Sequence, residues 1–383
     1  MEPSSVQGES HLQDQDSSWV GRVIEGRYRV DAVIGQGGMG VVLLAEHLKL
    51  QKKVALKVIL PEFAGSGELA ARFAREAMAS AKLDHPHIAS ALDYGTLEEG
   101  GAYLVMQYVK GKSLREHMAE HAGDWLFACE VGAQIADALA AAHAAGIVHR
   151  DLKPENIMLE QREDQRIHVR VLDFGIARVL DEQGGGGGER GKLTRAGTVL
   201  GTPGYMAPEQ ALGEPVDGRA DLYALGVILW ECIAGRDLFV GNDVASIISA
   251  QLTQVPDSLR LYAPSIPAEL DALVMKLLAT KKEDRLASPT HVRDVLHRYV
   301  LEHKLERIRE TKGGTSQTKA WVAMVQQAAR LVTKSITQRL SSIPLKEAIE
   351  GIDGWLARFP MLADKRRRVM AMAAGASLAF VLF

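Results

Sequence analysis

The segment VHRDLKPENIM, residues 148–158, places five ionisable side chains between apolar neighbours. Val148 and the pair 157–158 have the character of core residues, and the ionisable residues between them are His149, Arg150, Asp151, Lys153 and Glu155. Burying a charged group costs free energy unless the group is paired or hydrogen-bonded. So many charged side chains beside a core, closely followed by Asn156, indicate a functional site.

The composition around this segment is that of a large folded protein. The chain has 383 residues, of which 47% are hydrophobic, enough for two lobes or more than one domain. The net charge of −3 gives no argument for a nucleic-acid partner. Cys129 and Cys232 lack metal-ligand spacing, so we expect two buried thiols in a reducing compartment. Residues 1–18 are polar, and no secretory signal is expected.

The pattern of apolar residues divides the chain into a strand-rich part and a helix-rich part. β-Branched and alternating residues predict strands within 27–47, 52–60 and 102–111, and helical spacing predicts a helix over 67–83. From Cys129 onward the spacing becomes helical. We therefore expect an α+β fold of two lobes.

A glycine-rich turn lies inside the first strand region. The sequence GQGGMGVV places Gly35, Gly37 and Gly40 in a G-x-G-x-x-G-x-V frame. Because glycine has no Cβ, the backbone amides of such a turn can approach phosphates closely. A dinucleotide fold would continue into a helix, but residues 41–47 predict a second strand. A hairpin over nucleotide phosphates is therefore favoured, and an ordinary hairpin turn is the alternative.

Lys57 stands in the middle of the apolar strand VALKVI, residues 54–59. A buried lysine needs a partner or an anionic ligand. Glu76, on the helix predicted to follow, is a candidate partner. The alternative is an edge lysine whose amine reaches solvent along the surface.

These features belong to a set of ordered motifs. They are G-x-G-x-x-G-x-V at 35–42, VALK at 54–57, HRDLKPEN at 149–156, DFG at 173–175 and APE at 207–209. With them the chain resembles the eukaryotic-like protein kinases over residues 24–297. The form GTPGYMAPEQ and the apolar C-terminal segment make it similar to the bacterial membrane-associated Ser/Thr kinases.

The resemblance implies a bilobal protein kinase fold. A small β-rich N-lobe with one helix would cover about residues 24–109, and a larger helical C-lobe about residues 110–297. Residues 1–23 are expected to be a disordered N-terminal segment, because they are polar and rich in Ser, Gln, Asp and Glu.

The resemblance also implies a reaction, which is ATP- and Mg²⁺-dependent transfer of the γ-phosphate to Ser or Thr of protein substrates, with Mn²⁺ as a substitute metal. Asp151 would orient the substrate hydroxyl, and Lys153 would steady the transferring phosphate. Asn156 and Asp173 would hold the metal, which prefers hard oxygen ligands. Lys57, oriented by Glu76, would hold the α- and β-phosphates.

The remaining ATP contacts follow from the same resemblance. Ala55 and Met158 would enclose the adenine, and Met106 would lie at the back of the pocket. Gln107 departs from the Glu usual in related kinases, but the hinge there binds adenine through backbone atoms. The full set expected around ATP is Ile34, Gly35, Gln36, Gly37, Gly38, Met39, Gly40, Val42, Ala55, Lys57, Glu76, Met106, Gln107, Tyr108, Val109 and Met158.

Several positions would support the site without touching the substrate. His149 is expected to pack beneath Phe174, and Asp221 to anchor the backbone of the catalytic loop. The expected structural residues are Arg150, Phe174, Thr202, Glu209, Asp221 and Arg285, with Glu209 paired to Arg285 and Thr202 tying the substrate-facing loop to Asp151 and Lys153.

The segment between Asp173 and Glu209 is expected to be regulatory. Thr194 and Thr198 are the candidate autophosphorylation sites, because a phosphate there needs a basic partner and Arg150 could supply it. The alternative is that both threonines are exposed loop residues without such a role. Self-association that would serve autophosphorylation is also expected.

The C-terminal part differs in character from the rest. Residues 298–368 are expected to form a helical, basic linker, and residues 369–383 carry no charge. As a helix these last residues would span ~22 Å, against roughly 30 Å for a hydrocarbon core. The basic residues 365–368 precede them, which favours an inner-membrane tether with the kinase in the cytoplasm. The alternative is a helical hairpin packed on the protein.

Two other functions compete with catalysis of protein phosphorylation. A pseudokinase usually lacks one of the residues that Lys57, Asp151 and Asp173 represent, and all are present. A small-molecule phosphotransferase usually lacks the long segment that ends in APE, which is present with GTPGY in place to receive a peptide. The expected partners are therefore protein substrates and not nucleic acid.

Overall fold

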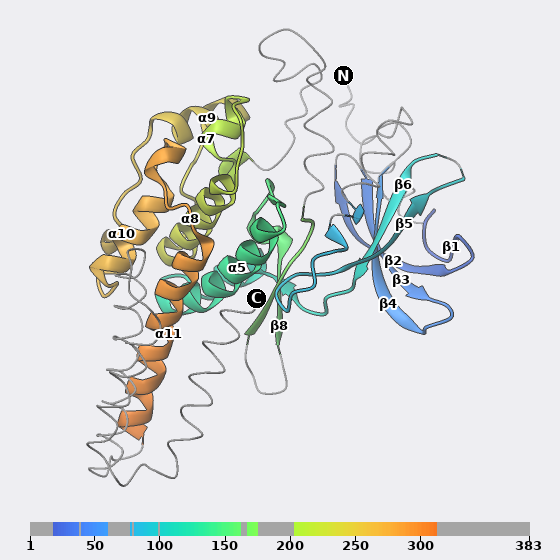
Figure 1. Cartoon of the computed structure of the whole chain (residues 1–383), viewed down its shortest axis with the longest axis horizontal. Helices are drawn as coiled ribbons and strands as arrows, with labels where there is room; N and C mark the ends of the chain where they lie inside the picture. The colour runs from blue at the N-terminus through green and yellow to red at the C-terminus, as the bar shows by residue number, and fades with distance from the viewer. Residues whose placement is uncertain are drawn as a thin grey trace, which may run out of the picture. The chain divides into compact units, whose positions relative to one another are not determined.

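The computed structural model describes residues 18–37, 40–59, 77–78, 80–98, 100–161, 167–174 and 203–311 (Figure 1). The chain forms two compact units, Met1–His303 and Lys304–Phe383, and of the second only residues 304–311 are described. The predicted positions outside the described residues are residues 1–17 of the N-terminal segment, Gly38, Met39, Glu76, Thr194, Thr198, Thr202, most of the linker and the apolar segment 369–383.

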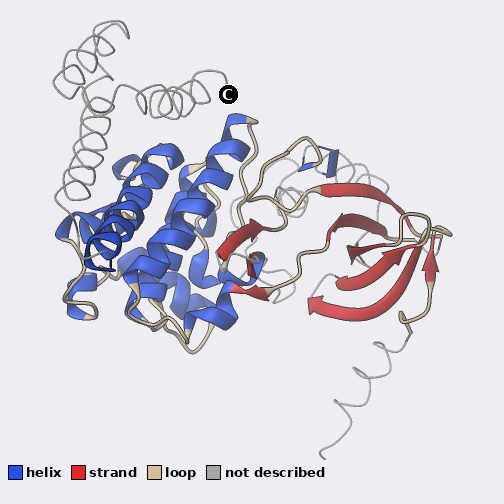
Figure 2. Ribbon diagram, turned by 90° about the horizontal axis from the view of Figure 1, so that it is seen from below, coloured by secondary structure: helices blue, strands red, loops and turns tan. Residues whose placement is uncertain are grey.

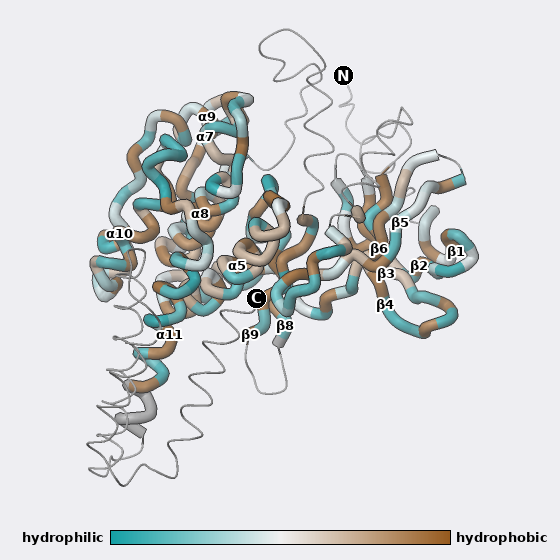
Figure 3. The backbone as a smooth tube through the Cα atoms, in the orientation of Figure 1, coloured by the Kyte–Doolittle hydropathy of each residue, from teal (hydrophilic) through white to brown (hydrophobic). Residues whose placement is uncertain are grey.

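The strand-rich part is a six-stranded antiparallel sheet in the order β1-β2-β3-β4-β6-β5. Its strands, red in Figure 2, are β1 Val23–Ile24, β2 Tyr28–Gly37, β3 Gly40–His47, β4 Lys52–Ile59, β5 Ala91–Thr96 and β6 Ala102–Gln107. Alternating side chains of β3 and β4 bury one face of the sheet, where Leu43, Leu56 and Tyr103 form its core. Figure 3 shows apolar residues gathered where β3, β4 and β6 lie side by side.

The register of this sheet brings the glycine-rich turn to Lys57. Gly35 of β2 pairs with Val42 of β3, and Val42 pairs in turn with Lys57 of β4. A break in the β2–β3 register between Val33 and Gly35 lies just before this row. The predicted phosphate-binding turn and the predicted phosphate-binding lysine therefore belong to one continuous stretch of sheet.

The helix-rich part is built around two helices. Its helices are α4 Leu114–Met118, α5 Trp125–Ala144, α7 Pro208–Ala211, α8 Arg219–Ala234, α9 Val244–Thr253, α10 Ala268–Leu277 and α11 Pro289–Thr311. A small sheet joins β7 Lys112–Ser113, β8 Ile157–Gln161 and β9 Ile167–Val171. Single 3-10 turns are η1 Pro154–Asn156, η3 Pro203–Tyr205, η4 Leu259–Leu261 and η5 Lys282–Asp284.

Helices α5 and α8 form the centre of this part because they are apolar on nearly every face. Close approach of the helices requires glycine at two positions. A Cβ on Gly132 of α5 would lie 2.7 Å from the Leu229 side chain of α8, and one on Gly226 would lie 2.8 Å from Cβ of Leu277. Asp124 caps the first turn of α5, accepting hydrogen bonds from two backbone amides.

Among the described helices, α5 alone is long and apolar enough to cross a membrane. Most of it is buried inside the helix-rich part, as expected of a core helix. Cys129 of α5 and Cys232 of α8 are both buried free thiols, so the predicted burial of the two side chains is confirmed.

Helix α11 continues past residue 297, where the sequence places the end of the globular domain. Tyr299 and Val300 belong to the core, so the turn after residue 297 still packs on the helix-rich part. The predicted boundary therefore falls inside a helix. Of the predicted helix over 67–83, only its last part, around Ala77 and Ser80, is described.

Candidate active site

The catalytic loop, residues 149–156, rests on one buried carboxylate. Asp221 of α8 is 1% exposed and accepts hydrogen bonds of 2.8 Å from the backbone amides of His149 and Arg150. Its Oδ2 also lies 2.7 Å from Nε2 of His143 on α5. Arg150 has a φ of +67°, a conformation that costs a non-glycine residue free energy. The contacts predicted for Asp221 are thus present, and they hold a strained turn of the loop.

His149 is a packing residue in the described structure, as the sequence indicates. Its ring is fully buried and meets the ring of Phe174 edge-on, with centroids 4.7 Å apart. Nε2 lies 2.8 Å from the carbonyl oxygen of Leu172. Because a carbonyl only accepts hydrogen bonds, Nε2 carries the proton and Nδ1 accepts from the backbone amide of Asp151.

The loop brings three of the predicted catalytic side chains together. Nζ of Lys153 lies 2.9 Å from Oδ2 of Asp151. The side-chain amide of Asn156, at the end of η1, donates to the same Oδ2 at 3.2 Å and to the backbone carbonyl of Asp151 at 2.8 Å. Both partners contact one oxygen, which fixes the orientation of the carboxylate.

Lys57 and Asp173 meet although they lie 116 residues apart. The amine of Lys57, on β4, donates to Oδ2 of Asp173 at 2.8 Å. Asp173 has a φ of +60°, and its Oδ1 is buried with no hydrogen-bond partner among the described residues. Lys57 is therefore paired, as a half-buried lysine requires. Its described partner is Asp173, since the predicted partner Glu76 lies outside the described residues.

The glycines of the turn have different reasons for being glycine. A Cβ on Gly40 would lie 1.9 Å from the carbonyl oxygen of Val58, so the sheet itself excludes any side chain there. At Gly35 a Cβ would make only ordinary contacts, and at Gly37 it would meet no described atom within 4 Å. Nothing described in the protein demands glycine at these two positions. The close approach of a ligand phosphate would demand it.

The adenine end of the predicted pocket is formed by adjacent strands. Ala55 of β4 pairs with Met106 of β6, and both are buried, as is Val109 in the following hinge. Ile34 and Gln36 lie on β2, and Gln107 ends β6. Tyr108 follows in the hinge, and Met158 lies on β8.

The residues predicted to hold a metal fit Mg²⁺. Among the described residues no group of three or more His, Cys, Asp or Glu is arranged as an all-protein metal site. Mg²⁺ instead favours one or two protein ligands together with waters and substrate phosphates. Asp173 offers a buried carboxylate oxygen that has no hydrogen-bond partner within the described part of the chain. Asn156 is tied to the same segment, because the backbone amide of Leu172 donates to the backbone carbonyl of Asn156 at 2.8 Å.

A buried network beside the loop was not predicted from the sequence, although Tyr205 and Glu155 belong to the quoted motifs. The hydroxyl of Tyr205, in η3, donates to Oε2 of Glu231 on α8 and also contacts a guanidinium nitrogen of Arg115. Arg115 in turn binds Glu155 of the catalytic loop at 2.9 Å. Burial raises the pKa of Glu231 to about 7 and also raises the pKa of Tyr205. The network joins residues far apart in the chain, so no local pattern announces it.

The predicted pair of Glu209 and Arg285 is present. The guanidinium donates two hydrogen bonds of 2.7 Å to the two oxygens of the carboxylate, and both groups are buried. Arg285 also donates to the carbonyls of Ala279 and Thr280. The pair therefore joins α7 to the segment that precedes α11, with all donors satisfied.

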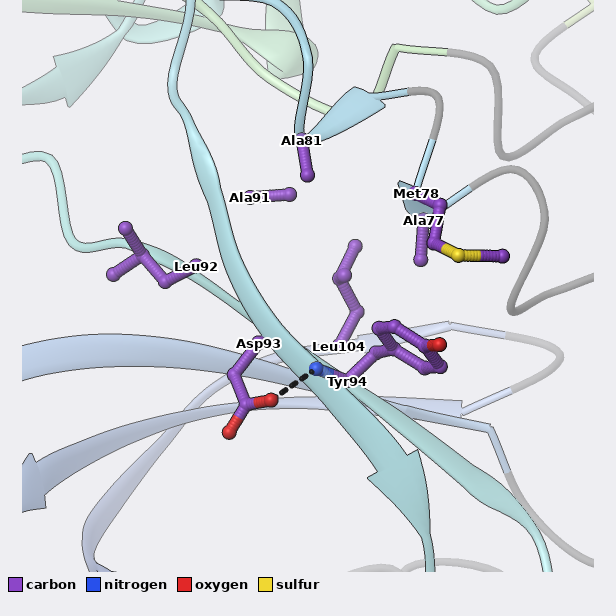
Figure 4. A pocket seen from close by; sticks show the side chains of 8 residues that line it. All are labelled: Ala77, Met78, Ala81, Ala91, Leu92, Asp93, Tyr94 and Leu104. Atoms are coloured by element: carbon purple, nitrogen blue, oxygen red, sulfur yellow. Dashed lines mark hydrogen bonds between the residues drawn. The ribbon is translucent and has the colours of Figure 1, made fainter.

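A small pocket of about 150 Å³ is lined by none of the predicted site residues (Figure 4). It is lined by Ala77, Met78 and Ala81 on one side, by Ala91, Leu92, Asp93 and Tyr94 of β5, and by Leu104 of β6. Asp93, its one charged residue, accepts from the amide of Tyr94 and pairs with Arg27. The pocket thus offers apolar contact and no uncompensated charge.

Comparisons with known proteins agree with this geometry. The protein kinase domain family matches residues 28–300. A serine/threonine-protein kinase of Myxococcus xanthus, pkn3, is 41% identical over 276 residues, which is 70% of this chain and 49% of that protein. PrkC of Bacillus subtilis, also named a serine/threonine-protein kinase, is 36% identical over 291 residues, 75% of this chain and 40% of that protein. The chain spans about half of these curated relatives or less.

One solved structure gives the same result for the fold. The crystal structure of a double mutant of the PknI kinase domain of Mycobacterium tuberculosis is 29% identical in sequence and superposes with a TM-score of 0.56. The match covers 73% of this chain and 98% of the solved domain.

Proposed function

The chain belongs to the protein kinase family, as its five motifs predict, and from this premise we propose that it transfers the γ-phosphate of ATP to Ser or Thr of proteins. The predicted α+β bilobal kinase fold is confirmed as well. The observation that carries the proposal is that two clusters of side chains are assembled. Lys57 pairs with Asp173 in one cluster, and Asp151 contacts Lys153 and Asn156 in the other. Neither the pseudokinase nor the small-molecule alternative accounts for a complete set beside a peptide-receiving segment.

Asp151 has the central role in this reaction. Its orientation is fixed through one oxygen by Lys153 and Asn156, so its carboxylate is prepared to accept a hydrogen bond from the substrate hydroxyl. Lys153 places a positive charge at the same point, where it would meet the phosphoryl group in transfer. The reaction thus depends on positioning and charge compensation more than on covalent chemistry by the protein.

Lys57 and the glycine-rich turn would bind the phosphates of ATP. The sheet register holds Lys57 next to the turn, and the turn has no side chains at Gly35 and Gly37. Asp173 and Asn156 would hold Mg²⁺, or Mn²⁺ in its place, and such an ion neutralises negative charge on the phosphoryl oxygens. The buried Oδ1 of Asp173, which no other described residue contacts by a hydrogen bond, supports this assignment.

Two parts of the proposal concern residues outside the described structure. We propose autophosphorylation at Thr194 and Thr198, which lie between the metal-binding Asp173 and the APE motif. We also propose a membrane tether formed by residues 369–383, because they are uncharged and follow the basic run 365–368. The kinase domain would then face the cytoplasm, where it meets its protein substrates.

The test of the proposed function is a phosphate-transfer assay with ATP, Mg²⁺ and casein. Asp151→Asn should lower kcat by about a hundredfold to a thousandfold, because loss of one preorganised interaction typically costs ~3 to 4 kcal/mol of barrier. Asp84→Asn, the same change at an exposed position, should have no effect. Near-normal transfer by a folded Asp151→Asn variant would exclude this role for Asp151.

A further inference from the structure

Helix α9 has one fully buried side chain, and that side chain is polar. Gln251 is 2% exposed, whereas Ile247 and Ile248 of the same helix are only half-buried. Burying an amide costs free energy unless its hydrogen bonds are made. A helix that buries glutamine in preference to isoleucine indicates that the amide has a specific task.

The amide of Gln251 binds one short segment of the chain. Its Nε2 donates to the carbonyl oxygen of Pro203 at 2.7 Å and to that of Met206 at 3.0 Å. Carbonyls only accept, so the nitrogen must be the atom that faces them, and both of its protons are used. Oε1 is buried and has no partner among the described residues. The two hydrogen bonds of Nε2 are therefore made although they leave the buried Oε1 of Gln251 without a described donor.

The same segment, residues 203–206, is held from a second direction. Tyr205 donates to Glu231 of α8, and Arg115 bridges Tyr205 to Glu155 of the catalytic loop. The segment is thus fixed between α9 on one side and the catalytic loop on the other. It carries the PGY of GTPGY, the sequence expected to face the protein substrate.

We propose that Gln251 is a positioning residue for the protein substrate, which it serves by holding the backbone of residues 203–206 beside the catalytic loop. The inference rests on the proposed kinase function. Because the described contacts of the amide are with the Pro203 and Met206 carbonyls, its loss should weaken use of the protein substrate and leave ATP binding unchanged.

Kinetics of the full chain with casein and ATP test this role. Gln251→Met fills a similar volume without donors, and Gln254→Met makes the same change at an exposed position of the same helix end. We expect Gln251→Met to raise the KM for casein by about tenfold, because the variant loses two modest hydrogen bonds to the substrate-facing segment. The KM for ATP should stay within about twofold of the wild-type value, and Gln254→Met should match wild type in both.

Gln251→Glu provides a second variant with a different signature. Its carboxylate would face two carbonyl oxygens, so the KM for casein should rise further at pH 8. Protonation restores one donor, so this increase should shrink as the pH falls toward 6. If Gln251→Met proves unfolded, the pH dependence of the KM for casein in Gln251→Glu tests the proposal instead. A dependence parallel to that of wild type would overturn the proposal.

Hydrogen exchange separates this inference from the proposed function. Backbone amides of residues 203–212 should exchange faster in Gln251→Met than in Gln254→Met. If wild-type protein transfers no phosphate, the kinase proposal fails, and exchange alone decides whether Gln251 holds the segment. Unchanged exchange would overturn the anchoring role, and faster exchange with an unchanged KM for casein would overturn the substrate role.

Discussion

Each of the two active-site aspartates, Asp151 and Asp173, uses one carboxylate oxygen to contact neighbouring side chains. Oδ2 of Asp151 is taken by Lys153 and Asn156, and Oδ2 of Asp173 is taken by Lys57. Such pairing holds a side chain in one rotamer and leaves the second oxygen for a ligand. In Asp173 that second oxygen is buried and unpartnered among the described residues, a cost that a bound cation would remove.

The raised pKa of Glu231 predicts that the stability of the protein depends on pH. Burial raises its pKa from 4.5 to about 7, so ionisation destabilises the folded state progressively as pH rises from about 4.5 to about 7. Glu231→Gln stays neutral at every pH. The stability of this variant relative to wild type should therefore improve by on the order of 3 kcal/mol between pH 4.5 and pH 8.

Urea denaturation of both proteins at several pH values measures this change. The variant loses an acceptor for Tyr205 or Leu238, so its stability at pH 4.5 should be below that of wild type. Glu302→Gln, at a position outside the network, is the control and should show no such trend. A pH-independent difference between Glu231→Gln and wild type would contradict the raised pKa.

Among the elements, glycine sets how closely α8 packs against α5, at Gly132, and against α10, at Gly226. Gly226→Ala should destabilise the protein by about 1 to 3 kcal/mol, because the new Cβ would lie 2.8 Å from Cβ of Leu277, an atom that cannot rotate away. Gly132→Ala should cost less. There the new Cβ meets the end of the Leu229 side chain, which can change rotamer, and alanine favours the helix by up to ~1 kcal/mol.

Urea denaturation midpoints of the two variants provide the measurement. Gly204→Ala is the control, since a Cβ there would meet no described atom within 4 Å. Equal losses of stability in Gly132→Ala and Gly226→Ala would show that the contacts with Leu229 and Leu277 do not limit how closely the helices approach.

The whole molecule contains a cluster of histidines that joins four of its parts. His85 and His87 precede β5, His168 lies on β9, Asp137 on α5 and Arg293 on α11. The rings of His87 and His168 have centroids 4.8 Å apart, and His85 binds Asp137 at 3.3 Å. Asp137 also pairs with Arg293, and these two partners hold its pKa well below the usual range.

Burial lowers the pKa of His87 from 6.5 to about 4. Stability from the neutral ring is therefore complete above about pH 6.5 and is lost as pH falls toward 4. His87→Asn keeps a donor for the carbonyl of Val169 without a titrating ring. Its Tm should fall less than that of wild type between pH 7 and pH 4.5, as measured by circular dichroism.

His291→Asn, a change on α11 outside this cluster, is the control and should follow wild type. A His87→Asn variant that loses as much Tm as wild type would show that His87 does not sense acid in this range.

How much could be read from the sequence depends on the separation of the partners. Asp151, Lys153 and Asn156 lie within one short motif, so the sequence alone placed them together. The resemblance assigned Lys57 to the phosphates, and the structure supplied the register that pairs it with Val42 beside the glycine-rich turn. Gln251 is 45 and 48 residues from the carbonyls it binds. A lone glutamine on an amphipathic helix is typical of an exposed face, and only the tertiary fold shows that it is buried.

The burial of both native thiols has a practical consequence. Cys129 and Cys232 are the only cysteines of the chain, and burial raises the pKa of each to about 12. Neither is a surface nucleophile in the folded protein. A fluorescent dye or spin label could therefore be attached to one cysteine introduced in each lobe without first removing the natural ones. Lobe opening during turnover can therefore be measured with labels on cysteines that are introduced directly into the wild-type sequence.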